Sequence, residues 1–225
     1  MKDKVILVTG ANGALGSVVA QHLLALGATV AGADRTEVAS QPPAKEFFSV
    51  AADLSSTAGA AEVVRAVVER YSRIDGVVHT VGGFALGPLH ELSDQEWSRL
   101  VDTNLNSAFY LLRAVLVHMR ERHNGRIVMI GSFAAAQPQP NLSAYIATKA
   151  ALHALVQSAA LENRYFGITL NAILPGTINT AANRAAMPAA DPSRWLAPQK
   201  LAQLGAQLLR DPDGTLTGAL LPLER

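Results

Sequence analysis

Short apolar segments alternate with helix-length segments along almost the whole chain, and this alternation constrains the fold more than any other feature. Segments typical of strands occupy residues 4–8, 29–33, 47–51, 76–80, 126–130, 169–174 and 216–221, and segments typical of helices occupy residues 14–26, 56–71, 96–122 and 144–166. Strands and helices of these lengths, in alternation, form βαβ units. The sequence therefore predicts one α/β domain over residues 1–225, a doubly wound parallel sheet of about seven strands with helices on both faces.

Charge and missing residue types exclude several classes of function. The formal net charge is +1 and the basic residues form no cluster, which argues against nucleic acid and acidic membranes as partners. The sequence has no cysteine, so disulfides, thiol catalysis and cysteine-ligated zinc are excluded, and the six histidines lack the spacing of metal ligands. The first apolar stretch, residues 5–8, is too short for a signal peptide or a membrane span. We expect a cytoplasmic protein that acts on a small molecule without a metal.

A glycine-rich turn joins the first predicted strand to the first predicted helix. Residues 9–16 read Thr-Gly-Ala-Asn-Gly-Ala-Leu-Gly. Glycines at such a junction let the backbone approach a pyrophosphate, which binds the free N–H groups of the helix N-terminus. The predicted dinucleotide contacts in this turn are Gly10, Asn12, Gly13, Ala14, Leu15 and Gly16.

Asp34 lies 18 residues after Gly16, at the end of the second predicted strand. An acidic residue at this place accepts hydrogen bonds from the adenosine ribose and repels a 2′-phosphate, which favours NAD(H). Arg35 follows directly and would partner a 2′-phosphate if it turned inward, so NADP(H) stays open as the alternative cofactor. A third interpretation makes Asp34 only a turn residue.

Tyr145 and Lys149 are four residues apart in the predicted helix 144–166. Side chains at this spacing share one helical face. An ammonium beside a phenol favours the phenolate and lowers the phenol pKa from its usual value of about 10, so the pair is suited to proton transfer. Ser132 follows the fifth predicted strand; it is either part of the same site or a strand-end turn residue.

These features, in this order, resemble the short-chain dehydrogenase/reductase family over nearly the whole chain. The resemblance implies a Rossmann-type fold and an NAD(P)-dependent oxidoreductase that transfers hydride between nicotinamide and a carbonyl or alcohol. Tyr145 is then the general acid/base and Ser132 a second hydrogen-bond donor. Lys149 lowers the Tyr145 pKa and holds the nicotinamide ribose, and Asn104 anchors a water that links Lys149 to solvent.

The same resemblance implies further contacts to the cofactor. Asp53 matches the acidic residue that binds the adenine amino group. His-Thr-Val-Gly at residues 79–82 replaces the usual Asn-Asn-Ala-Gly, and Ala14 stands where a glycine is usual. Self-association as a homodimer or homotetramer through the long helices is also implied. The cofactor contacts that depend on the resemblance are Asp53, Leu54, Val81, Gly82, Tyr145, Lys149, Pro175, Gly176, Ile178 and Thr180.

Residues 176–199 interrupt the alternation with three prolines and no clear strand. A stretch of this length after a strand predicts a mobile substrate lid with a short helix, or else simple disorder. Within it, Thr180, Asn183-Arg184, Met187-Pro188, Ala190-Asp191 and Trp195 resemble the dihydropteridine reductases, which reduce a quinonoid dihydropterin with NADH and lack the catalytic serine. Three functions therefore remain: a carbonyl reductase or alcohol dehydrogenase, a dihydropteridine-type reductase, and a catalytically silent dinucleotide-binding regulator.

Overall fold

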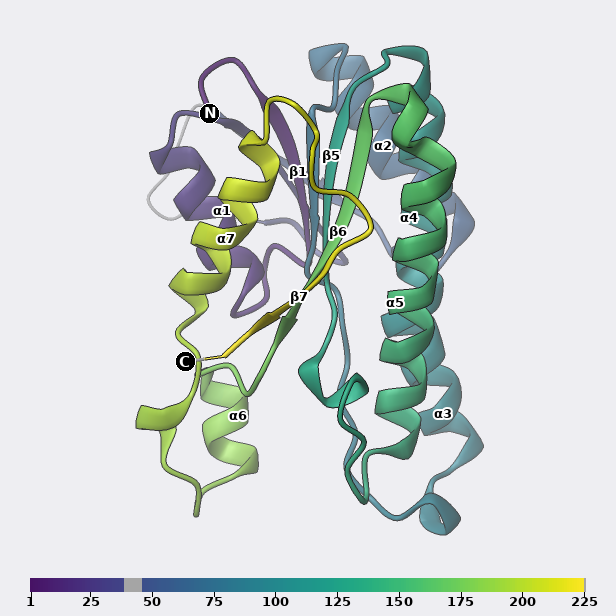
Figure 1. Ribbon diagram of the computed structural model, residues 1–225, viewed down its shortest axis with the longest axis vertical. Coiled ribbons are helices and arrows are strands. Elements are labelled where there is room, and N and C mark those ends of the chain that lie inside the picture. The colour runs from purple at the N-terminus through teal and green to yellow at the C-terminus, as the bar shows by residue number, and fades with distance from the viewer. Residues whose placement is uncertain (39–45, 225) are drawn as a thin grey trace.

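The strands of the described chain, residues 1–38 and 46–224 of the computed structural model, lie side by side in one sheet (Figure 1). All pairs are parallel, and the order is β3-β2-β1-β4-β5-β6-β7. The bounds are Val5–Thr9 (β1), Thr29–Asp34 (β2), Phe47–Ala51 (β3), Gly76–His79 (β4), Gly125–Ile130 (β5), Ile168–Pro175 (β6) and Leu220–Leu223 (β7). The central strands are buried along their whole length because helices cover both faces. The predicted doubly wound parallel sheet is confirmed.

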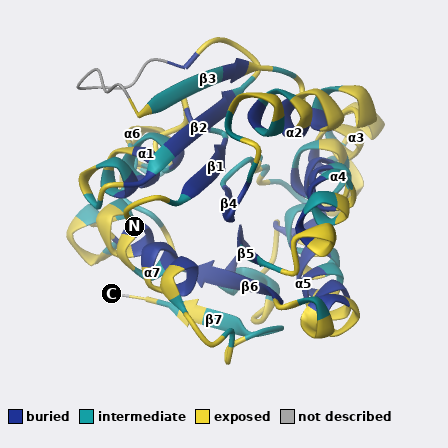
Figure 2. Cartoon of the chain, turned by 90° about the horizontal axis from the view of Figure 1, so that it is seen from above, coloured by how far each residue is buried: buried dark blue, intermediate teal, exposed yellow. Residues whose placement is uncertain are grey.

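Helices cover both faces of this sheet (Figure 2). On one face lie α1 (Gly16–Ala25) and α7 (Pro198–Arg210), which pack on each other; on the other lie α2 (Thr57–Tyr71), α4 (Ser107–Glu121) and α5 (Ser143–Asn163). Each face has its own apolar core, represented by Ile6, Val8, Leu23 and Leu209 on the first side and by Leu7, Val77, Leu111 and Val156 on the second. No helix within the described ranges has the length and apolar character to cross a membrane.

The strand order places a crevice at the carboxyl edge of the sheet. β2 and β3 lie to one side of β1, whereas β4 to β7 lie to the other, so the direction of winding reverses between β1 and β4. Open α/β sheets bind their ligands outside the carboxyl ends of the strands at such a reversal. The short helix α6 (Ala181–Ala186) lies beyond the carboxyl end of β6 (Figure 1). The loops that follow β1, β4, β5 and β6 are therefore positioned to build a site.

Three elements differ from the sequence prediction. The helix predicted over residues 96–122 is divided into α3 (Asp94–Val101), a π-turn (Asp102–Asn106) and α4. The helix α7 was not predicted, although its buried positions recur at helical spacing. The last strand begins at Leu220 rather than at residue 216, because the Asn171 side chain binds the Leu216 carbonyl and the Ala219 N–H before the chain can pair with β6.

The predicted lid has a defined path between β6 and α7, residues 176–197. It contains α6 and a 3₁₀ turn, Pro192–Arg194. Its two ends are joined by backbone bonds, from Asn179 N to the Leu196 carbonyl (2.8 Å) and from Leu196 N to the Thr177 carbonyl (2.8 Å). Leu196 itself is buried. The short helix that the sequence predicted here is therefore present, and the segment is fastened at its base.

Candidate active site

The turn after β1 is closed by contacts that leave no room for a side chain at Gly10 or Gly16. Gly10 has a left-handed backbone (φ +71°), and its N–H donates to the Ala33 carbonyl at 2.8 Å. A Cβ on Gly16 would lie 2.1 Å from the Gly10 carbonyl oxygen. Glycine at position 16 thus lets α1 start directly against the turn, and the N-terminus of a helix is an anion-binding site. A dinucleotide pyrophosphate fits this cradle.

Asp34 ends β2 with both carboxylate oxygens held by backbone amides. Asn12 N donates to Oδ2 (2.9 Å) and Arg35 N donates to Oδ1 (2.8 Å). The Asn12 side chain in turn donates to the Thr36 hydroxyl at 3.1 Å, which ties the glycine turn to the end of β2. These bonds fix the direction of the carboxylate while leaving lone pairs for two further donors, as a pair of ribose hydroxyls would require.

A cleft of about 810 Å³ is lined by half of the predicted cofactor contacts. Its wall includes Gly10, Asn12, Gly13, Asp34, Arg35, Asp53, Leu54, Val81 and Gly82. α3 and the π-turn add a polar stripe at helical spacing, formed by Gln95, Ser98, Arg99 and Asp102, which sequence analysis missed. Among the described residues, the following predicted cofactor and catalytic residues do not line the cleft: Ala14, Leu15, Gly16, Pro175, Gly176, Ile178, Thr180, Ser132, Tyr145 and Lys149.

Asp53 and Arg35 both line this cleft. Ser55 donates to Asp53 Oδ1 from its N–H (3.0 Å) and from its hydroxyl (2.8 Å). These two bonds, with a smaller contribution from the Arg35 charge, hold the Asp53 pKa below its usual value. Asp53 is therefore ionised at neutral pH and able to accept a hydrogen bond from an amino group.

Tyr145 and Ser132 are brought together at the carboxyl end of β5, where the Ser132 hydroxyl lies close enough to the phenol to affect its pKa. The Phe84 ring packs edge-on against the Tyr145 ring, with centroids 5.0 Å apart. Burial raises the Tyr145 pKa above its usual value, and the Ser132 hydroxyl offsets this only in part. The phenol is thus protonated at neutral pH.

The prediction that Lys149 lowers the Tyr145 pKa is not what the structure shows. Lys149 is buried and donates from Nζ to the Ile130 carbonyl at 2.9 Å. Burial lowers its own pKa to about 8, and burial, rather than the ammonium, dominates the pKa of Tyr145. The spacing of four residues shows that the two side chains share a helical face, but it carries no information about how far each is removed from water.

Asn104 lies in the π-turn and is completely buried. Its Oδ1 accepts from Gly83 N (2.7 Å), and its Nδ2 donates to the Gly83 carbonyl (3.1 Å) and to the Thr148 hydroxyl (3.0 Å). A Cβ on Gly82 would be 3.3 Å from both Asn104 Oδ1 and Lys149 Nζ. Gly82, which also lines the cleft, therefore marks the point where the cofactor cleft reaches the polar groups around Lys149.

Replacing Asn104 with Ala should lower the free energy of unfolding by about 1–3 kcal/mol, because the Gly83 N–H and carbonyl lose their partner and Thr148 loses one of its two hydrogen bonds. The measurement is urea unfolding. Asn106→Ala is the matched control: the same substitution in the same π-turn removes only an exposed bond to Asp102 Oδ1 (2.8 Å). Equal effects of the two substitutions would show that the contacts of Asn104 contribute nothing to stability.

The loop after β6 lies on the lid side of the site. Pro175 is the last residue of β6, and Gly176 N donates to the Leu223 carbonyl at 3.1 Å. Ile178 pairs with Leu196, and the Thr180 hydroxyl accepts from Asn183 N (3.2 Å) as the N-cap of α6. These residues hold the base of the lid, so their predicted contacts to a cofactor remain a proposal.

Two buried histidines near Lys149 were not identified from the sequence. His79 bridges the Thr9 hydroxyl (2.8 Å) and the Ser107 hydroxyl (3.2 Å), and His153 Nε2 accepts from Ser132 N at 3.3 Å. Burial, together with the Lys149 charge, lowers the pKa of His79 to about 3 and that of His153 to about 4. Both rings are neutral at physiological pH. Their partners come from other strands and helices, so no local motif indicates them.

Potential metal ligands do not gather at this site. Residues 1–38 and 46–224 contain no group of three or more His, Cys, Asp or Glu side chains arranged to hold a metal ion. The polar groups that do converge are a phenol, a hydroxyl, an ammonium and a carboxamide. Such a set can donate hydrogen bonds to an oxygen atom that gains negative charge.

Comparison with known proteins places this site in context. Residues 4–191 match the family model described as short chain dehydrogenase. Acetoacetyl-CoA reductase of Allochromatium vinosum is 32% identical, over 98% of this chain and 96% of the relative. NAD⁺-bound xylitol dehydrogenase superposes with a TM-score of 0.90 at 27% identity, covering 99% and 98% of the two chains.

A third similar protein, 3-ketoacyl-(acyl-carrier-protein) reductase from Brucella melitensis in complex with NADH, has a TM-score of 0.88 at 26% identity, covering 99% and 97% of the two chains. The family match extends from β1 to Asp191, directly before the 3₁₀ turn of the lid segment, and so includes the glycine turn, Ser132 and Tyr145. The chain belongs to the short-chain dehydrogenase/reductase family of oxidoreductases.

Proposed function

We propose that this protein is an NAD(H)-preferring oxidoreductase that interconverts a small carbonyl compound and the corresponding alcohol. The observation that carries the proposal is the contact between the Ser132 hydroxyl and the Tyr145 phenol, on the same helix as buried Lys149, whose Nζ lies beside Gly82 of the dinucleotide cleft. The turn closed by Gly10 and Gly16 fits a pyrophosphate, and the fixed Asp34 carboxylate fits a ribose.

The side chains supply the proton and the stabilisation of charge. When bound, a nicotinamide supplies or accepts the hydride. Tyr145 donates its proton to the carbonyl oxygen, and the Ser132 hydroxyl donates a second hydrogen bond to the same atom. General-acid assistance of this kind typically contributes about 10²–10⁴ in rate. In this proposal the Lys149 ammonium holds the nicotinamide ribose, and Asn104 fixes the Gly83 backbone, next to Gly82, which lies beside Lys149 Nζ.

Cofactor preference depends on the charge of Asp34. In Asp34→Asn, the ratio of kcat/KM for NADH to that for NADPH should fall about tenfold, equivalent to about 1.4 kcal/mol, because a neutral amide no longer repels a 2′-phosphate. Steady-state kinetics with both cofactors measures this ratio.

The control for this substitution is Asp213→Asn, which removes an exposed carboxylate outside the cofactor cleft and should leave the ratio unchanged. If Asp34→Asn also leaves it unchanged, then Asp34 is only a turn residue, and the proposed preference for NADH loses its support. Arg35 would then be the residue to test for contact with a 2′-phosphate.

The substrate class is tested by NADH and NADPH oxidation against acetoacetyl-CoA, small ketones and aldehydes, and quinonoid dihydropterin. Two of the similar proteins are reductases of ketoacyl thioesters, and one is a dehydrogenase of a polyol. The presence of Ser132 beside Tyr145 supports a carbonyl substrate, since dihydropteridine reductases lack this serine. Turnover of the pterin alone would overturn this choice. Cofactor binding without turnover of any substrate would support the silent regulator.

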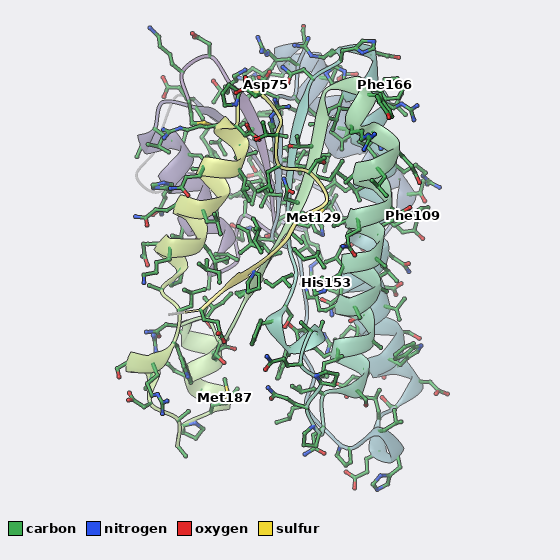
Figure 3. The ribbon with its side chains drawn as sticks, in the orientation of Figure 1. Asp75, Phe109, Met129, His153, Phe166 and Met187 are labelled. Atoms are coloured by element: carbon green, nitrogen blue, oxygen red, sulfur yellow. The ribbon has the colours of Figure 1, made fainter. Side chains whose placement is uncertain are left out.

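The proposal includes self-association through α4 and α5. Large apolar side chains are exposed on these helices, including Phe109 and Val117 on α4 and Leu161 on α5. Phe109 lies on the outer side of the helical layer, away from the sheet (Figure 3). A second copy of the chain would cover this surface in a homodimer or homotetramer. The cytoplasmic location expected from the sequence stays a prediction.

A further inference from the structure

His153 lies directly against the peptide that leads into Ser132. It is eight residues after Tyr145 on α5 and 6% exposed, between that helix and the sheet (Figure 3). Its Nε2 accepts the Ser132 N–H at 3.3 Å. A Cβ on Gly131 would lie 2.4 Å from the same nitrogen, so the imidazole occupies the space that a side chain at position 131 would take. The ring therefore fits this one backbone segment closely.

The hydrogen bond requires a neutral imidazole. A protonated ring carries N–H on both nitrogens and cannot accept from an amide. Burial lowers the His153 pKa, and the charge of Lys149, one turn earlier on α5, lowers it further. The other groups beside the ring are Gly131, directly after β5, and Leu174 of β6, and neither carries a charge. The pKa of about 4 leaves Nε2 free to accept throughout the physiological range.

The position of the Ser132 hydroxyl depends on this contact. Ser132 is extended (φ −156°, ψ 135°), beyond the last hydrogen-bonded pair of β5 with β6, and its amide has His153 as its partner. A rotation of the 131–132 peptide would carry Oγ away from Tyr145. Misplacement of a reacting group by about 1 Å can cost about 10²-fold in rate.

We propose that His153 is a positioning residue, which holds the Ser132 amide so that the Ser132 hydroxyl stays beside the Tyr145 phenol. This inference rests on the proposed function, in which Ser132 and Tyr145 bind the carbonyl oxygen. His153 itself touches neither substrate nor cofactor in this mechanism. It acts from behind the strand end, through one backbone bond.

The test compares His153→Leu, which removes the acceptor, with His153→Gln, which keeps one. In His153→Leu, kcat for carbonyl reduction should fall about 10- to 100-fold while the Kd for NADH changes less than about twofold, and His153→Gln should recover most of the loss. His118→Leu is the control, since its buried Nε2 has no hydrogen-bond partner in the described chain; its kcat should stay at the wild-type value.

A double-mutant cycle separates positioning from general packing. If His153 acts through Ser132, then His153→Leu should cost little further kcat in a Ser132→Ala background. Full additivity of the two losses would overturn the proposal, and so would equal losses in the Leu and Gln variants.

The contact itself is measured independently of turnover by hydrogen exchange at the Ser132 amide. Exchange should be protected in the wild type and in His153→Gln, and at least about tenfold faster in His153→Leu, because an amide without its acceptor opens to solvent more readily. Unchanged protection in His153→Leu would overturn the proposal whatever the activity. A wild type that protects this amide but reduces no carbonyl would instead overturn the proposed function.

Discussion

Tyr145→Phe should lower kcat for carbonyl reduction by about 10²–10⁴ and change the affinity for NADH by less than about twofold. The substitution removes one oxygen and keeps the ring that packs against Phe84. Because burial raises the Tyr145 pKa, the wild-type phenol carries its proton at neutral pH, and this is the proton that the variant lacks. His153, the other titratable side chain bonded to Ser132, contacts its amide and not its hydroxyl, so the loss has no ready substitute.

Single-turnover kinetics and a fluorescence titration with NADH measure the two effects separately. Tyr110→Phe on α4 is the matched control: it removes a phenol hydroxyl that makes no hydrogen bond within residues 1–38 and 46–224, and kcat should not change. A Tyr145→Phe enzyme that kept more than about a tenth of the wild-type kcat would rule out Tyr145 as the general acid, given the usual size of that contribution.

Gly16→Ala should raise the Kd for NADH more than about tenfold and lower the free energy of unfolding by about 1–3 kcal/mol. The added Cβ would lie 2.1 Å from the Gly10 carbonyl oxygen and 2.7 Å from the Thr80 hydroxyl. Neither neighbour can yield easily, since Thr80 Oγ1 donates to the Thr9 carbonyl at 2.7 Å and Gly10 is part of the turn itself. The helix must move away from the turn, and its N–H groups move away from the pyrophosphate.

Gly205→Ala is the control for the effect of replacing a helical glycine with alanine where no steric clash results. Gly205 is buried in α7, yet nothing lies within 4 Å of the place where its Cβ would stand. Alanine is favoured over glycine inside a helix by about 1 kcal/mol, so this variant should be slightly more stable and bind NADH as the wild type does. If Gly16→Ala also kept wild-type affinity, the turn after β1 would not be the pyrophosphate site.

Local features of the sequence predicted most of the fold and part of the site. The apolar runs of the buried strands and the glycine turn express constraints that act between near neighbours, and the strands from β1 to β6 lie where they were predicted. Contacts between distant segments were not predicted. The bond from Ser132 to His153, the bridge from Asn104 to Gly83, and the polar stripe of α3 along the cleft each depend on how elements pack together.

The errors have the same origin. Asn171 holds residues 216–219 with side-chain bonds, a device that strand propensity does not detect, so the last strand was placed too early. The Lys149–Tyr145 pair was interpreted through its spacing, whereas the pKa of each group depends on burial by β5, α5 and the loop after β4. The π-turn that contains Asn104 has no proline or glycine to mark it in the sequence, because a π-turn requires neither.

That π-turn has a consequence for how such a site can be acquired. A π-turn is equivalent to one residue inserted into an α-helix, and the helix resumes afterwards with its phase unchanged. The buried positions on either side follow one continuous stripe, from Leu100 through Asn104 to Ala108, Leu111 and Val115. The extra length is thus confined to a single bulge that points inward. A regular, purely structural helix could gain this polar contact by one insertion, without repacking the core on either side of it.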